Sequence, residues 1–127
     1  MQVLSSRIIL RPANYRATLS FYKDVLGLAI SREYASGTVF FAGQGLIEVA
    51  DHGGSGSSNT FEGALWLQVK DIAKAQSELA AKGVRIDREA KRESWGLHEL
   101  WITDPDGVKI VVVQVPDDHP LRRDSRS

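Results

Sequence analysis

Cysteine is absent from the 127 residues of this chain. Its absence excludes a disulfide framework, a thiolate zinc site, an iron–sulfur cluster and a cysteine nucleophile. A net charge of one sign is lacking too, because 16 Lys and Arg balance 16 Asp and Glu when His is counted as neutral. Proteins that bind nucleic acids or membrane surfaces through charge carry a clear excess of basic residues. The composition therefore predicts neither kind of partner.

Long apolar runs are missing as well. No stretch approaches the roughly 18 apolar residues of a membrane-spanning helix. The first residues, Met1–Ser6, lack the charged start and apolar run of a secretory leader. We therefore expect a cytoplasmic protein. Hydrophobic residues make up 43% of the 127 residues, which is enough for the core of one soluble domain.

The first half of the chain predicts the order β-α-β-β-β. Asn14 is a favourable N-cap, and Gly27 stands where a left-handed C-cap would end a helix, so residues 14–26 are expected to be helical. Runs of β-branched and aromatic residues around this helix predict four strands, at Arg7–Leu10, Leu28–Tyr34, Thr38–Ala42 and Leu46–Ala50.

The second half repeats this order. Asp71 is a favourable N-cap for a second helix, and Gly83 follows that helix as Gly27 follows the first. The sequence Asp-Pro-Asp-Gly at residues 104–107 predicts a turn between the last two strands. Four strands are expected here, at Ala64–Val69, Val84–Ile86, Leu97–Thr103 and Lys109–Val115.

We interpret residues 1–116 as a single domain made of two modules, at residues 3–50 and 62–116, with a connection at residues 51–61. Residues 53–59 contain only Gly, Ser and Asn, the composition of a flexible connection. Residues 117–127 carry one strong apolar side chain, Leu121, and are expected to form a disordered tail. Neither module can bury its own sheet face, so the modules should pack together or against a second chain.

A family resemblance rests on the helix motif at residues 19–28, on Trp95-Gly96 and on the turn at residues 104–107. With the repeated unit, residues 3–115 resemble the vicinal oxygen chelate superfamily, which includes glyoxalase I, extradiol dioxygenases, fosfomycin-modifying enzymes and bleomycin-resistance proteins. The resemblance implies an α+β glyoxalase/bleomycin resistance-like fold. In that fold two tandem βαβββ modules form an open curved sheet, or cup, often completed by the partner chain of a homodimer.

The resemblance also implies where a metal would be held. Enzymes of this family bind a divalent metal with His and Glu at four strand positions, which leaves open sites for substrate. Matched onto this sequence, the four positions are Arg7, Glu48, Ala64 and Val111. Glu48 alone keeps a ligand side chain, and arginine coordinates nothing at ordinary pH. We therefore expect neither a metal nor another cofactor.

A metal site rebuilt from other residues is the alternative. His52, His98 and Glu99 are the available side chains, but nothing in their spacing places them with Glu48. Surface histidines are the simpler interpretation.

With the metal positions replaced, the cup should be mostly apolar with one charged spot, which is typical of a small-molecule pocket. Alternation along the fifth strand places Ala64, Trp66 and Gln68 on one face, so Trp66 faces inward if Ala64 does. Trp95 lies in a loop beside a glycine. Each aromatic ring, including Trp101 and Phe40, has core packing or a dimer interface as its alternative role.

Arg7 and Glu48 both occupy positions that point into the cup in the family. We predict that they form an ion pair in place of the metal and act as a polar anchor, the alternative being two solvated charges at strand ends. The complete set of expected ligand contacts is Arg7, Glu48, Trp66, Gln68, Trp95, His98, Trp101 and Phe40.

Three functions are compatible with these residues. The first is a metal-free binding protein that sequesters an aromatic or apolar natural product, as in antibiotic resistance, and that acts as a homodimer. The second is a metal-dependent lyase or isomerase resembling glyoxalase I, or a dioxygenase, with Glu48 as surviving ligand or base. The third is a structural or regulatory dimer with an empty cup. Because three of the four ligand positions are lost, the sequence favours the first.

Overall fold

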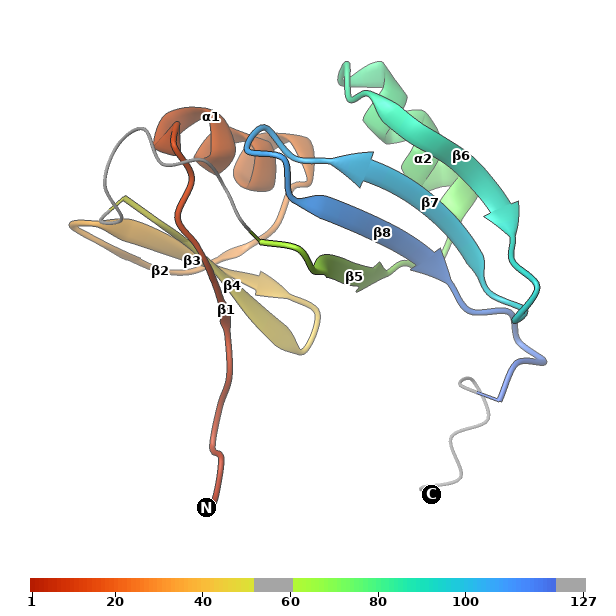
Figure 1. Cartoon of the computed structure of the whole chain (residues 1–127), viewed down its shortest axis with the longest axis horizontal. Helices are drawn as coiled ribbons and strands as arrows, with labels where there is room; N and C mark the ends of the chain where they lie inside the picture. Colours follow the sequence, from red (N-terminus) through yellow and green to blue (C-terminus); the bar gives the residue numbers. More distant parts are fainter. Residues whose placement is uncertain (52–60, 121–127) are drawn as a thin grey trace. The chain divides into compact units, whose positions relative to one another are not determined.

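The computed structural model describes residues 1–51 and 61–120 (Figure 1). Of these, residues 1–51, 61–62 and 104–108 make one compact unit, and residues 63–103 and 109–120 make a second. Each unit contains one four-stranded mixed sheet, and the chain has the order β-α-β-β-β twice. The predicted α+β class and the repeat of this order are confirmed.

The first unit forms its helix where the N-cap and the glycine stop predict it. The side chain of Asn14 accepts a hydrogen bond from the Ala17 N–H at 3.0 Å, and Gly27 has φ of 69°. Between them, α1 (Tyr15–Ser20) continues into a π-helical segment, η1 (Phe21–Val25). The sheet has the order β1-β4-β3-β2. Its strands are β1 (Ile8–Leu10), β2 (Ile30–Tyr34), β3 (Gly37–Ala42) and β4 (Gly45–Ala50).

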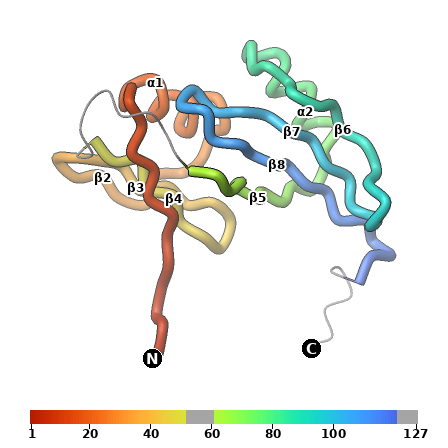
Figure 2. Tube along the Cα trace, in the orientation of Figure 1, coloured from red at the N-terminus to blue at the C-terminus, as the bar shows by residue number. Residues whose placement is uncertain are grey.

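The second unit repeats the arrangement. The side chain of Asp71 caps α2 (Ile72–Ala81) by accepting a hydrogen bond from the Lys74 N–H at 3.0 Å. The helix packs on one face of the sheet, against β6, β7 and β8 (Figure 1). In the sheet, β8 runs between β5 and β7 (Figure 2). The strands are β5 (Ala64–Gln68), β6 (Ile86–Arg92), β7 (His98–Thr103) and β8 (Lys109–Gln114).

The prediction of the sixth strand was wrong. It placed the strand at Val84–Ile86, whereas β6 spans Ile86–Arg92. This strand has the sequence Ile-Asp-Arg-Glu-Ala-Lys-Arg and lies at the edge of its sheet, where charged side chains remain in water. A strand of this kind lacks the apolar run used to recognise strands, so its pairing with β7 is a tertiary effect.

The turn predicted at residues 104–107 is present, and it is built around Asp104. The Asp104 carboxylate accepts hydrogen bonds from the N–H groups of Asp106 at 2.8 Å and Val108 at 2.9 Å. Its other oxygen accepts the Tyr22 hydroxyl at 2.8 Å. Burial of the Tyr22 ring raises the pKa of its hydroxyl well above the ordinary value, so it remains a donor. This buried arrangement stabilises the first unit.

The interface between helix and sheet forms the core of each unit. In the first, Tyr22 and Phe40 are fully buried, with ring centroids 6.4 Å apart. In the second, Leu100, Ile102 and Ile110 are fully buried on the face that α2 covers. Among the described residues no helix is long and apolar enough to cross a membrane.

Several predicted segments lie outside the described residues. They include His52, the flexible connection at residues 53–59 and most of the predicted tail. Within the described part of that tail, the His119 N–H donates to the Pro116 carbonyl at 3.0 Å, which closes a turn.

Candidate functional site

Strand pairing determines which side chains of the first sheet share a face. Glu48 on β4 is opposite Val39 on β3 and Ile9 on β1, and paired residues point to the same side. Thr38 and Phe40, one position away along β3, point to the other side, where the Tyr15 hydroxyl of α1 contacts the Thr38 hydroxyl at 3.2 Å. Glu48 therefore lies on the face of this sheet that its helix leaves uncovered.

Two donors from the described part of the chain hold Glu48 there. The Arg7 Nη1 lies 2.9 Å from Glu48 Oε1, so the predicted ion pair is confirmed. The Tyr34 hydroxyl donates a hydrogen bond to Glu48 Oε2. This hydrogen bond raises the pKa of Tyr34, which keeps the phenol protonated. The guanidinium of Arg32 lies over the Tyr34 ring, 5.6 Å from its centroid. Both carboxylate oxygens of Glu48 are therefore engaged by the protein.

Tyr34 is a partner of Glu48 that was not among the predicted site residues. It reaches Glu48 because Gly37, its partner across the β2–β3 pair, has no side chain. A Cβ at Gly37 would come within 2.6 Å of the Tyr34 hydroxyl and 2.8 Å of the Val49 carbonyl oxygen. The sequence does place a tyrosine at the end of a predicted strand, shortly before Ser36 and Gly37. Its contact with Glu48, however, depends on the register of three strands.

The residues at the four family positions do not fit a metal. Glu48 already binds a guanidinium and a phenol, and Arg7 is itself a cation. Ala64 on β5 and Val111 on β8 have no donor atom in their side chains. Elsewhere among the described residues, no group of three or more His, Asp or Glu is placed to hold a metal ion.

The uncovered face of the second sheet carries a row of large side chains. Strand pairing aligns Trp66 on β5, Val111 on β8, Trp101 on β7 and Arg88 on β6. Trp66 is 47% exposed, whereas Trp101 packs on an apolar cluster. This cluster consists of Leu97, Val111, Val113 and Val115. We call this surface the tryptophan face. The tryptophan face offers a flat apolar surface close to charged side chains.

A second row of the tryptophan face aligns Gln68, Val113 and Glu99. Glu99 is 7% exposed. Its Oε2 accepts a hydrogen bond from the indole Nε1 of Trp95 at 2.8 Å. The loop that carries Trp95 is held in turn by His119, whose Nε2 lies 3.0 Å from the Trp95 carbonyl oxygen. Trp95 is 56% exposed and keeps its ring at the surface.

Apart from Arg7, Glu48 and Trp95, the predicted ligand contacts fall into two groups. Trp66, Gln68 and Trp101 share the tryptophan face. Phe40 and His98 lie on the opposite faces of their sheets: Phe40 is fully buried against Tyr22, and His98 is paired with Gln114, whose side chain accepts the Ile72 N–H of α2. We therefore leave Phe40 and His98 out of the candidate site.

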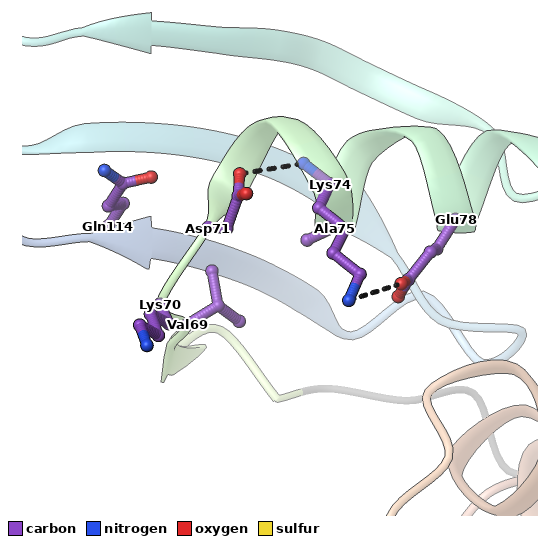
Figure 3. Close-up of a pocket in the computed structure, with 7 residues that line it drawn as sticks. All are labelled: Val69, Lys70, Asp71, Lys74, Ala75, Glu78 and Gln114. Atoms are coloured by element: carbon purple, nitrogen blue, oxygen red, sulfur yellow. Dashed lines mark hydrogen bonds and ion pairs between the residues drawn. The ribbon is translucent and has the colours of Figure 1, made fainter.

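A broad, open depression lies at the start of α2 (Figure 3). Three of its charged side chains have structural partners: Asp71 caps the helix, and Lys74 lies 3.9 Å from Glu78 (Figure 3). This surface presents no group arranged for chemistry. The lining residues are Val69, Lys70, Asp71, Lys74, Ala75, Glu78 and Gln114.

A sequence model described as the Glyoxalase/Bleomycin resistance protein/Dioxygenase superfamily matches residues 5–112. No curated protein sequence matches the chain. Among solved structures it is similar to lactoylglutathione lyase from Agrobacterium tumefaciens, with 17% identity, a TM-score of 0.70, and 90% of this chain and 94% of that chain covered. It is also similar to a glyoxalase-related enzyme from Fulvimarina pelagi, with 21% identity, a TM-score of 0.72, and 91% and 90% covered. At these identities the likeness concerns the fold alone.

Proposed function

Because this chain belongs to the Glyoxalase/Bleomycin resistance protein/Dioxygenase superfamily, we propose that it is a small-molecule binding protein that holds an aromatic or apolar ligand without a metal. Sequestration of a toxic natural product, as in antibiotic resistance, is the role we propose for this binding. The mechanism is affinity alone, through stacking on tryptophan and removal of apolar surface from water.

The state of Glu48 carries the proposal. A carboxylate that acts as a metal ligand or as a general base needs an oxygen that can reach the metal or the substrate proton. In this protein a guanidinium engages one oxygen of Glu48 and a phenol engages the other. The pair formed by Arg7 and Glu48 therefore supplies fixed polarity to the uncovered face of the first sheet, where the half-exposed side chains of Ile9 and Phe41 offer apolar contact.

The tryptophan face supports an aromatic ligand. Trp66 is 47% exposed in the middle of an edge strand, where its ring is available for stacking. Trp101 is held in place by the apolar cluster beneath it, so little side-chain entropy would be lost on binding. An ordered aromatic platform of this kind is typical of sites that hold flat ligands.

Isothermal titration calorimetry with planar aromatic compounds tests the proposal. Trp66→Ala should weaken binding about two- to tenfold, the range expected from losing one aromatic pair. Phe61→Ala is the matched control, because Phe61 is also an exposed ring, 40% against 47%, but belongs to the first unit. Equal losses in both variants would contradict the assignment of the tryptophan face.

A lyase, isomerase or dioxygenase with Glu48 as base or ligand is the alternative function. It requires Glu48 to leave Arg7 and Tyr34, and none of the contacts among residues 1–51 and 61–120 favours that change. Elemental analysis of protein purified without chelator decides between the two. One equivalent of zinc, nickel, manganese or iron per chain, with an activity that chelation removes, would overturn the binding function.

We also propose that the protein acts as a homodimer. Strand β1 is an edge of its sheet, and Ile8 and Ile9 on it are 42% and 49% exposed. Apolar edge strands are commonly covered by a second chain. Sedimentation velocity at micromolar concentration should give twice the 14.0 kDa of one chain. A single species at the mass of one chain would contradict the dimer.

A further inference from the structure

Among the described residues, the buried carboxylates Glu48 and Glu99 lie on uncovered sheet faces, and they differ in how fully the protein satisfies them. Glu48 is bonded through both oxygens. Glu99 on β7 is equally buried, at 7% exposure for each residue, but its side chain is bonded through Oε2 alone, to the Trp95 indole. Among the described residues, Glu99 Oε1 has no hydrogen-bond partner, and it is not one of the fully enclosed polar atoms. This oxygen is therefore accessible from the surface.

The charge of Glu99 is also uncompensated within the described part of the chain. Arg88 is the nearby cation, and its guanidinium donates to the Glu99 backbone carbonyl at 3.3 Å. Its charge, however, is taken by an ion pair with the buried Glu93 carboxylate. Lys91 is opposite Glu99 on β6, yet the two side chains form no ion pair. A buried carboxylate normally has a cationic partner, because water alone stabilises it poorly there.

The surroundings of Glu99 suit an organic cation. Trp101 is two residues away on the same face of β7, and Val113 is opposite on β8. Trp95 brings a third apolar surface, with its N–H directed to Glu99. Aromatic rings attract cations across their faces, and an aromatic surface beside a carboxylate is well suited to a protonated amine on a flat apolar body. An anionic ligand would be repelled by the unpaired carboxylate.

We propose that Glu99 anchors the ligand, and that the ligand is a flat aromatic molecule carrying a protonated amine or another cationic nitrogen. The cationic nitrogen donates a hydrogen bond to Glu99 Oε1 while the aromatic body lies along Trp101 toward Trp66. This assignment rests on the proposed binding function and defines the ligand class for it. It requires no metal and no chemical step.

Three acridines that differ mainly in charge test this assignment by isothermal titration calorimetry at neutral pH. The probes are 9-aminoacridine, which is protonated, acridine, which is neutral, and acridine-9-carboxylate, which is anionic. Wild-type protein should bind 9-aminoacridine about tenfold or more tightly than acridine, the effect of one hydrogen bond to a charged group, and should bind the carboxylate most weakly. This comparison needs no variant.

Glu99→Gln then removes the charge and keeps an oxygen that can accept the Trp95 N–H. The preference for 9-aminoacridine over acridine should disappear in this variant. Glu89→Gln is the matched control, because Glu89 is exposed on β6 and the substitution removes the same charge from the same sheet. The control should keep the wild-type preference.

The outcomes separate the two proposals. If acridine and 9-aminoacridine bind equally well to the wild type, or if the preference survives in Glu99→Gln, the anchor is wrong and the binding function stands. If none of the three probes binds to the wild type, both the anchor and the proposed ligand class are overturned. Loss of the preference in the Glu89→Gln control would also overturn the anchor, because the effect would then reflect general surface charge.

Discussion

Replacing Arg7 by methionine should destabilise the protein more than replacing Glu48 by glutamine, although both changes break the same ion pair. The reason is the difference in burial: the Glu48 side chain is 9% exposed and the Arg7 side chain is 38% exposed. Without Arg7, the buried Glu48 carboxylate loses the guanidinium that is paired with it. Without the Glu48 charge, the Arg7 guanidinium can turn into water. Breaking the ion pair at Arg7 therefore costs more stability than breaking it at Glu48.

The magnitude follows from this partial exposure. Removing one partner of a fully buried pair costs about 3–5 kcal/mol, and an exposed pair contributes about 0.2–1 kcal/mol. Because solvent screens Arg7, we expect a loss of about 2 kcal/mol for Arg7→Met and about 1 kcal/mol for Glu48→Gln. The double variant removes both charges and should lose no more than Glu48→Gln alone, so the coupling energy is about 2 kcal/mol.

Urea titration and thermal unfolding, both followed by far-UV circular dichroism, measure all four proteins of this cycle. At roughly 4 °C per kcal/mol, the melting temperature of Arg7→Met should fall by about 8 °C. Lys74 and Glu78 provide the control pair, because they are 72% and 60% exposed and 3.9 Å apart. Their coupling should stay below about 0.5 kcal/mol. Additive effects at Arg7 and Glu48, or a larger loss for Glu48→Gln, would refute the reasoning.

Three further changes have defined outcomes. Gly37→Ala should destabilise the first unit by about 1–3 kcal/mol in urea titrations, because the added Cβ displaces Tyr34 and the buried Glu48 carboxylate loses a donor. An unchanged free energy of unfolding would mean that Tyr34 does not need this space. Trp101→Ala should cost about 2 kcal/mol or more, because the ring covers an apolar cluster, whereas Trp66→Ala should cost less than about 1 kcal/mol; equal losses would show that both rings are core. Burial raises the pKa of Asp104 above its ordinary value of 3.8. The contribution of the protonated Asp104 side chain to stability is therefore complete below pH 3.8, and it is lost as the pH rises through the raised pKa. Wild type should therefore lose stability relative to Asp104→Asn as the pH rises above about 4, and a gain of wild-type stability relative to the variant over that rise would contradict this sign.

Local signals were sufficient for most of the secondary structure. Asn14 and Asp71 cap their helices with side-chain oxygens, and Gly27 and Gly83 end them with φ of 69° and 80°. These features depend on a few neighbouring residues, which is why a single sequence reveals them. The pair of Arg7 and Glu48 came from family positions on two strands, and the parallel pairing of β1 with β4 brings the two side chains together.

Tertiary structure decided the rest. Charged β6 becomes a strand because β7 offers it an edge, and no apolar pattern in its own sequence announces it. Phe40 faces the core and Trp101 the opposite side of its sheet because of strand register, and a shift of one residue would exchange such faces. Register likewise determines that Tyr34 completes the partners of Glu48, whereas Glu99 keeps one oxygen without a partner in the described chain. Composition determines which groups are available, but only the pairing of distant strands determines which charges are neutralised.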